Sequence, residues 1–256
     1  MRSVRLLAFG WVLNVKMMMR SAFNGVLSVV WPMFFATTAF FMYRAGHDAH
    51  TLLFASLGAS VMGIWSATST SASSILQRER RHGTLELLAA APASFALVLL
   101  PISVAMTTVG LYSMVATLLW GHFVFGIAMH LVHPLLFVVA VPVTIASVGA
   151  LGFLLSVACV RYRSAWALGN ALEYPVWLIC GFLVPLSLLP GWVGPFSWVL
   201  APTFGVRAIR EAALGGTPVG DLLACAGLGV AYFAIGVLIA DRVLQAARRT
   251  AALQLS

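Results

Sequence analysis

One polar stretch interrupts an otherwise apolar chain: Gln77-Arg78-Glu79-Arg80-Arg81-His82-Gly83-Thr84-Leu85-Glu86-Leu87-Leu88. Five of its residues are charged, and long apolar segments flank it on both sides. Because so many charges are too costly inside a bilayer, we expect a loop at a membrane face. Its charged entry, its glycine and its apolar end predict a turn followed by a short helix that ends near Pro92.

The composition is that of an integral membrane protein. Of 256 residues, 61% are hydrophobic and only 9% are charged, and the mean hydropathy is +0.99. Soluble domains carry about 25% charged residues, whereas a membrane-spanning helix needs about 20 apolar residues. Apolar runs recur along the whole length, so we expect one all-α, polytopic membrane domain over residues 1–256.

The hydropathy pattern predicts six transmembrane helices. Their approximate ranges are 23–43, 51–76, 96–120, 134–158, 165–184 and 221–241. Residues 1–22 carry basic side chains within about a 60° sector, which predicts an amphipathic elbow helix in the membrane interface. The alternative is that residues 1–22 simply begin the first span. Residues 185–220 are rich in Pro, Trp and Gly and predict short helices tucked into the interface.

Lys and Arg are distributed unequally between the two sides of the predicted topology. The side that holds both termini has twelve: Arg2, Arg5, Lys16, Arg20, Arg78, Arg80, Arg81, Arg161, Arg163, Arg242, Arg248 and Arg249. The other side has three: Arg44, Arg207 and Arg210. Basic residues accumulate in cytoplasmic loops, so we expect both termini in the cytoplasm. This clustering also argues against nucleic-acid binding as the reason for the net charge of +8.

The second predicted span carries a ridge of small residues at every fourth position. Its members are Ala55, Ala59, Gly63, Ala67 and Ser71. Such a ridge lets a neighbouring helix approach closely.

Two stretches of the chain resemble known sequences. Residues 79–88, followed by Ala91-Pro92-Ala93-Ser94, resemble the coupling segment of type-2 ABC transporter permeases, the membrane subunits related to drug-resistance and Nod-factor exporters. Residues 185–192, with Pro202-Thr203 and Ile209-Arg210, resemble the external re-entrant segment of that family. The order of elements fits over nearly the whole chain. Family members often have a basic residue and a glycine at the start of the third span and an asparagine at position 201. Their absence here leaves the subfamily and the substrate open.

The resemblance implies the permease of an ATP-driven exporter in a bacterial inner membrane. Its substrate would be hydrophobic or amphipathic, such as a drug, antibiotic, lipid or peptide. Its partners would be two ATPase subunits that bind ATP and Mg, membrane lipid, and a second permease that is identical or homologous. The coupling loop at 77–95 would use Arg78, Glu79, Arg80, Arg81, Gly83, Thr84, Leu85, Glu86, Leu87, Leu88 and Pro92. The external gate would use Pro185, Pro190, Trp192, Pro202 and Arg210.

The residues of the loop suit this role physically. Thr84 can cap a short helix, and Glu86 in its first turn interacts favourably with the helix dipole. The leucines offer apolar contacts to a groove on a partner. The alternative is a solvated loop with ordinary cytoplasmic charges.

Glu173 is an ionisable residue within the fifth predicted span, beside Tyr174 and near Trp177. Such residues are costly in a membrane and usually face a cavity or a partner, so these three residues are candidates for a substrate pathway. The alternative is that Glu173 pairs with Arg161 or Arg163.

The sequence offers no catalytic residues and no cofactor site. It contains no phosphate-binding P-loop motif, and its only lysine is Lys16, so any ATPase must be a separate chain. His130 and His133 could share a helix face, but two ligands make a poor metal site. Two other functions stay open: a non-transporting scaffold or sensor that binds a cytosolic partner through residues 77–95, and an ion-coupled carrier.

Overall fold

The computed structural model describes residues 2–19, 22–44, 49–81, 95–127, 131–159 and 165–249, which are mostly helical with no strand among them. The predicted all-α class is therefore confirmed for these residues. The elements are α1 (Arg2–Met19), α2 (Ala22–Arg44), α3 (Ala49–Arg81), α5 (Phe95–Phe125), α6 (Pro134–Cys159), α7 (Ala165–Ile179), the 3-10 turn η1 (Leu186–Leu188), α8 (Val193–Trp198), α9 (Ala201–Leu214) and α10 (Pro218–Arg249).

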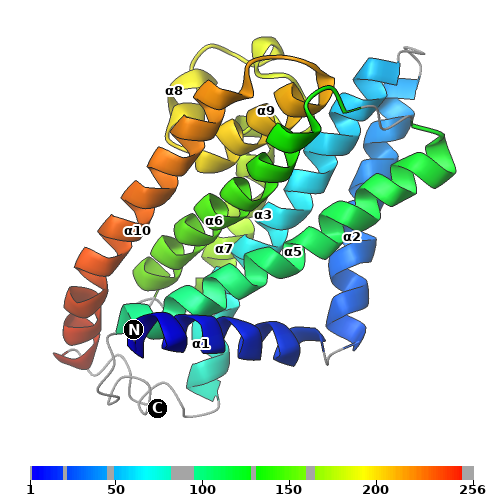
Figure 1. The fold of residues 1–256 in the computed structure, drawn as a ribbon. Helices are drawn as coiled ribbons and strands as arrows, with labels where there is room; N and C mark the ends of the chain where they lie inside the picture. Colours follow the sequence, from blue (N-terminus) through cyan, green and yellow to red (C-terminus); the bar gives the residue numbers. More distant parts are fainter. Residues whose placement is uncertain are drawn as a thin grey trace.

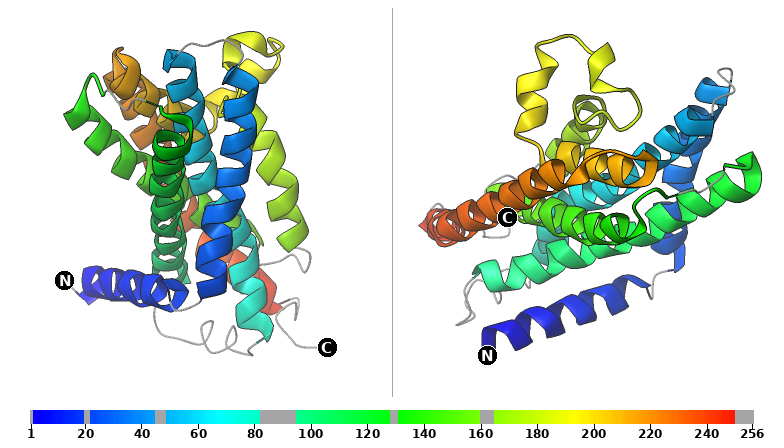
Figure 2. Two further views of the ribbon diagram at one scale, coloured as in Figure 1. Left: turned by 90° about the vertical axis from the view of Figure 1, so that its right-hand side faces the viewer. Right: turned by 45° about the horizontal axis from the view of Figure 1, so that its top comes forward.

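The long helices form a bundle that α1 crosses at one end. Figure 1 shows α3, α5, α6 and α10 running alongside one another, with α1 lying across them. The indole Nε1 of Trp11 donates to Thr108 Oγ1 on α5 at 3.2 Å. The last turns of α3 and α10 lie at this same end, called the α1 end below, whereas α8 and α9 lie at the opposite end, the α9 end (Figure 1, Figure 2).

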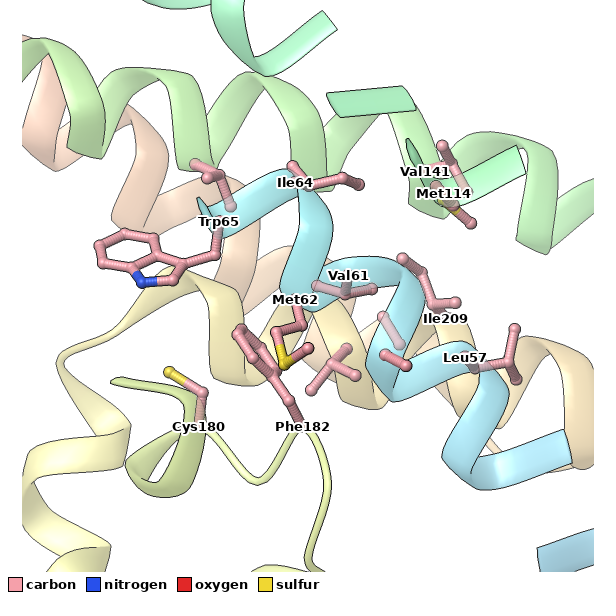
Figure 3. Close-up of a cluster of buried hydrophobic side chains, with 14 of the residues drawn as sticks. Leu57, Val61, Met62, Ile64, Trp65, Met114, Val141, Cys180, Phe182 and Ile209 are labelled. Carbon is pink, nitrogen blue, oxygen red and sulfur yellow. The ribbon is translucent and has the colours of Figure 1, made fainter. Parts of the chain in front are cut away.

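Helix α3 is the core of the bundle, because it packs against α2, α5, α6, α7 and α9. Of its small-residue ridge, Ala55, Ala59 and Gly63 are buried and Ala67 is half-buried, while the Ser71 side chain lies outside the described residues. Helix α5 comes close to α3 one position along from Gly63, where a Cβ added at Gly110 would lie 2.8 Å from the Cα of Ile64. Figure 3 shows the apolar cluster around α3.

Four helices in the described part of the chain are long and apolar enough to cross a membrane. Their apolar segments are His50–Ser69, Leu99–Phe125, Pro134–Ala158 and Pro218–Ala240. A shorter apolar stretch, Met33–Met42, lies in α2. Helix α7 has 15 residues and is therefore about 22 Å long, less than the roughly 30 Å of the hydrocarbon core. Six spans thus stay a prediction.

Helix α10 begins at Pro218 and runs to Arg249, eight residues beyond its predicted end at 241. Three other predicted boundaries are also wrong. Helix α3 continues to Arg81, five residues beyond the predicted end, because Gln, Arg and Glu are good helix formers and basic residues favour a helix C-terminus. Arg78, Glu79, Arg80 and Arg81 therefore belong to a helix and not to a loop. Helix α5 also runs beyond its predicted end, to Phe125, which shortens the predicted connection at 122–133.

The third wrong boundary is at the end of α7, which stops at Ile179 and not at 184. Gly181 has φ +71°, a backbone conformation that favours glycine. The Phe182 N–H bonds the Trp177 carbonyl at 3.2 Å, and the Gly181 N–H bonds the Leu178 carbonyl at 3.0 Å. This pair of bonds is the Schellman motif that closes helix C-termini.

Candidate functional site

Two polar contacts join α3 to the helices beside it, and they form the candidate site. The first is a partly buried hydrogen bond in which Ser66 Oγ on α3 donates to Glu173 Oε1 on α7. Only 5% of the Glu173 side chain is exposed. An ionisable group at this depth in a membrane protein is costly, so its retention favours a functional role.

The three predicted pathway residues do not share one environment. Trp177 is buried, and its ring meets that of Phe35 on α2 edge-on, with centroids 4.9 Å apart. Tyr174 is half exposed and contacts the Trp177 ring from outside, also at 4.9 Å. Glu173 and Trp177 thus lie inside the bundle, whereas Tyr174 lies on its surface. Arg161 and Arg163, the alternative partners of Glu173, lie outside the described residues.

The second contact is made by Arg210 on α9, which is 6% exposed. Its guanidinium donates to the carbonyls of Phe54 (3.2 Å), Gly181 (2.7 Å) and Phe182. It also lies 3.5 Å from the centroid of the Phe54 ring, a cation–π geometry. The Arg210 side chain therefore connects α9 to α3 and to the turn after α7. The sequence placed Arg210 among the external basic residues, and nothing local marks it as buried.

The predicted gate residues fall into two groups. Pro202 is buried with Arg210 in α9, whereas Pro190 and Trp192 are exposed and Pro185 is half-buried. The short helices expected in 185–220 are present as η1, α8 and α9. Pro190 and Trp192 therefore do not share the buried environment of Pro202 and Arg210.

Helix α9 is held at both ends by other elements. At its start, the Tyr232 hydroxyl on α10 donates to the Val199 carbonyl and accepts from the Ala201 N–H at 3.3 Å. At its end, the Val132 and His133 N–H groups bond the carbonyls of Ala213 and Ala212 at 3.1 and 2.9 Å. These contacts fix a helix whose residues are mostly buried.

An ion pair adds a surface contact between α9 and α10. Arg207 Nε lies 3.0 Å from Asp221 Oδ2. Glu211 lies near this pair. Burial raises the pKa of Glu211, as does the charge of Asp221, while Arg207 lowers it.

The coupling stretch is described only as far as Arg81. The final turn of α3 lies at the α1 end, together with the last turns of α10 (Figure 1, Figure 2). Gly83, Thr84, Leu85, Glu86, Leu87, Leu88 and Pro92 lie outside the described residues.

Sequence reasoning missed two residues of the site. Gly58 was not singled out, although a Cβ there would lie 1.7 Å from the Phe182 carbonyl oxygen and 2.2 Å from Arg210 Nη2. Tyr232 gave no signal beyond being a tyrosine in an apolar helix. No group of three or more His, Cys, Asp or Glu side chains in the described ranges could hold a metal ion.

Comparison with known proteins addresses the identity of this helical bundle. No curated protein matches the chain. The family model described as ABC-2 type transporter matches residues 7–214, which is most of the chain. The resemblance to type-2 ABC permeases is thereby confirmed, and the chain belongs to the ABC-2 type transporter family.

Proposed function

We propose that this transporter permease subunit works in an ATP-driven exporter of a hydrophobic or amphipathic substrate, such as a drug, antibiotic, lipid or peptide. The observation that carries the proposal is the course of α3. This helix runs without a break from its contact with Arg210, past Ser66, to Arg81. Arg81 leads directly into the coupling-like residues, so a force applied there acts on the centre of the bundle.

The proposed partner is a separate ATPase, present in two copies, that binds ATP and Mg and grips residues 82–92. Leu85, Leu87 and Leu88 would enter an apolar groove, and the arginines at the end of α3 would pair with acidic groups of the ATPase or with lipid phosphates. A second permease, identical or homologous, would complete the pathway. ATP binding would draw the two coupling segments together and reshape the pathway between the two permeases.

The proposed location is a bacterial inner membrane with both termini in the cytoplasm. The twelve-to-three distribution of Lys and Arg supports this orientation. So does the grouping of α1 and the last turns of α3 and α10 at one end of the bundle. In this orientation the α9 end faces outward, and α1 lies in the cytoplasmic interface.

The coupling role is tested by reconstituting the permease with its ATPase in proteoliposomes and measuring substrate-stimulated ATP hydrolysis. Glu86→Arg and Gly83→Pro should each abolish most of the stimulation, because the first reverses a charge in the coupling helix and the second stiffens its entry. Thr217→Arg, which introduces an arginine at an exposed site at the α9 end, should leave it unchanged. Full stimulation in both coupling variants would refute the assignment. ATPase binding without any stimulation in the wild type would favour the scaffold or sensor function instead.

The pathway role of Glu173 is tested separately. Glu173→Gln keeps an acceptor for Ser66 but removes the ionisable group, so we expect export of cationic or polar substrates and its pH profile to change while the amount of folded protein does not. Leu178→Ala, on the exposed face of α7 and outside the candidate pathway, is the control and should transport as the wild type does. If Glu173→Gln transports as the wild type does at every pH, Glu173 has no role in the pathway.

A further inference from the structure

The turn that follows α7 is bound by an arginine from another helix. After the Schellman turn, the carbonyls of Gly181 and Phe182 point to the Arg210 guanidinium. Carbonyls at a helix C-terminus carry partial negative charge, so a cation there is favourable. A guanidinium has five N–H donors in a planar fork, enough to bind these two carbonyls and the Phe54 carbonyl together. Lysine has no such fork.

Gly58 makes this arrangement sterically tight. Any side chain at this position of α3 would overlap the Phe182 carbonyl and the Arg210 guanidinium. Phe182 itself is fully buried, and Figure 3 shows it in the same apolar cluster as Met62 of α3. The backbone of α3 at Gly58 therefore lies against the backbone of Phe182, α9 reaches both segments through the Arg210 side chain, and the Phe54 ring covers the guanidinium.

We propose that Arg210 is a positioning residue that keeps α9 and the α9 ends of α3 and α7 joined throughout the transport cycle. We call this contact among Arg210, α3 and α7 the junction. Any movement of α3 relative to α7 during the cycle is then confined to the other side of the junction, toward Ser66 and Glu173. The proposal rests on the proposed transport function for its role in the cycle. The junction itself can be tested without any ATPase.

Cys180 is a native reporter of the junction, because it precedes Gly181 and is buried. In a background with Cys159→Ser and Cys225→Ser, the rate of Cys180 labelling by a small maleimide is measured in purified permease. Gly58→Ala and Arg210→Gln should raise the rate by at least about tenfold, the factor expected when a charge-assisted hydrogen bond is lost. Arg210→Lys should give a smaller increase. Gly227→Ala, at an exposed helical glycine with open space around it, is the matched control.

Phe54→Leu gives a second route if an Arg210 variant does not fold, because it removes the stacked ring and keeps the Phe54 backbone carbonyl. It should also speed labelling. Rates for Gly58→Ala and Phe54→Leu that stay within about twofold of the control would overturn the junction, since no local opening would then have occurred.

The role in the cycle is tested with the ATPase present. With Arg210 intact in the Cys159→Ser, Cys225→Ser background, Cys180 labelling should be the same without nucleotide and with ATP plus vanadate, while folded Arg210→Lys should transport less substrate per ATP hydrolysed. Labelling that rises with ATP plus vanadate, or an unchanged transport ratio in Arg210→Lys, would overturn the positioning role. Failure of the proposed exporter function is distinguishable, because the wild type would then show no substrate transport while the labelling differences among the variants persisted.

Discussion

Removal of the Tyr232 hydroxyl should loosen the start of α9. This hydroxyl donates to the Val199 carbonyl and accepts from the Ala201 N–H, so Tyr232→Phe removes two hydrogen bonds at once. Val199 follows α8 directly, and Ala201 is the first residue of α9. The ring stays, so the packing of α10 changes little and the effect is confined to hydrogen bonding.

The magnitude follows from the two lost bonds. A buried hydrogen bond contributes about 1 kcal/mol net, so the variant should lose about 2 kcal/mol of local stability. That loss corresponds to about a 30-fold larger population of the locally open state. Amide hydrogen exchange by mass spectrometry, on peptides covering residues 199–206 in detergent, reports this opening directly.

Tyr174→Phe is the control, because its ring is half exposed and its ring contact with Trp177 does not need the hydroxyl. It should exchange in residues 199–206 as the wild type does. If Tyr232→Phe also exchanges there within about twofold of the wild type, the hydroxyl does not hold α9, and the account of how this helix is fixed is wrong.

Two further substitutions test packing and charge. Gly110→Ala places a Cβ 2.8 Å from the Cα of Ile64, so α3 and α5 must separate. We expect this to cost about 1–3 kcal/mol of stability and to lower the apparent Tm in detergent. Gly227→Ala, the control, should leave the apparent Tm unchanged. An unchanged Tm in both would show that the helices are not in backbone contact. Burial, with a smaller contribution from a neighbouring carboxylate, raises the pKa of Glu211 above its ordinary 4.5. The folded protein thus binds the Glu211 proton more tightly than the unfolded chain does. The contribution of Glu211 to stability is therefore present below pH 4.5 and is lost as the pH rises from there through the raised pKa of the folded protein. Glu211→Gln should therefore flatten the dependence of apparent Tm on pH, and an equally steep curve would contradict the assignment.

The local sequence pattern was sufficient to predict most helices. It was not sufficient where contacts with distant residues determine the structure. The range of α6 was predicted to within a residue, because an uninterrupted apolar run between Pro134 and the basic turn leaves little choice. The end of α7 was missed because its apolar pattern continues past Ile179. The helix ends in the turn at Gly181, whose carbonyl accepts a hydrogen bond from Arg210, 29 residues further along the chain.

The extension of α3 was missed for a different reason. Hydropathy marks where a helix leaves the apolar layer, not where it ends, and the residues up to Arg81 are polar helix formers. In the candidate site, Glu173 could be found because a carboxylate in a span is rare. Its partner Ser66 was one of several hydroxyls in α3, and only the packing of α7 selects it.

The length of α3 has a mechanical consequence. At about 1.5 Å per residue, Ser66 lies about 18 Å and Arg81 about 40 Å from Phe54 along the helix. If α3 pivots as a rigid rod about its contact with Arg210, Ser66 moves less than half as far as Arg81. A displacement of about 4 Å at Arg81 would then shift Ser66 by about 2 Å, enough to break its hydrogen bond, whose useful range ends near about 3.5 Å. Such a lever would convert a modest movement at the membrane surface into the making or breaking of one buried polar contact at Glu173.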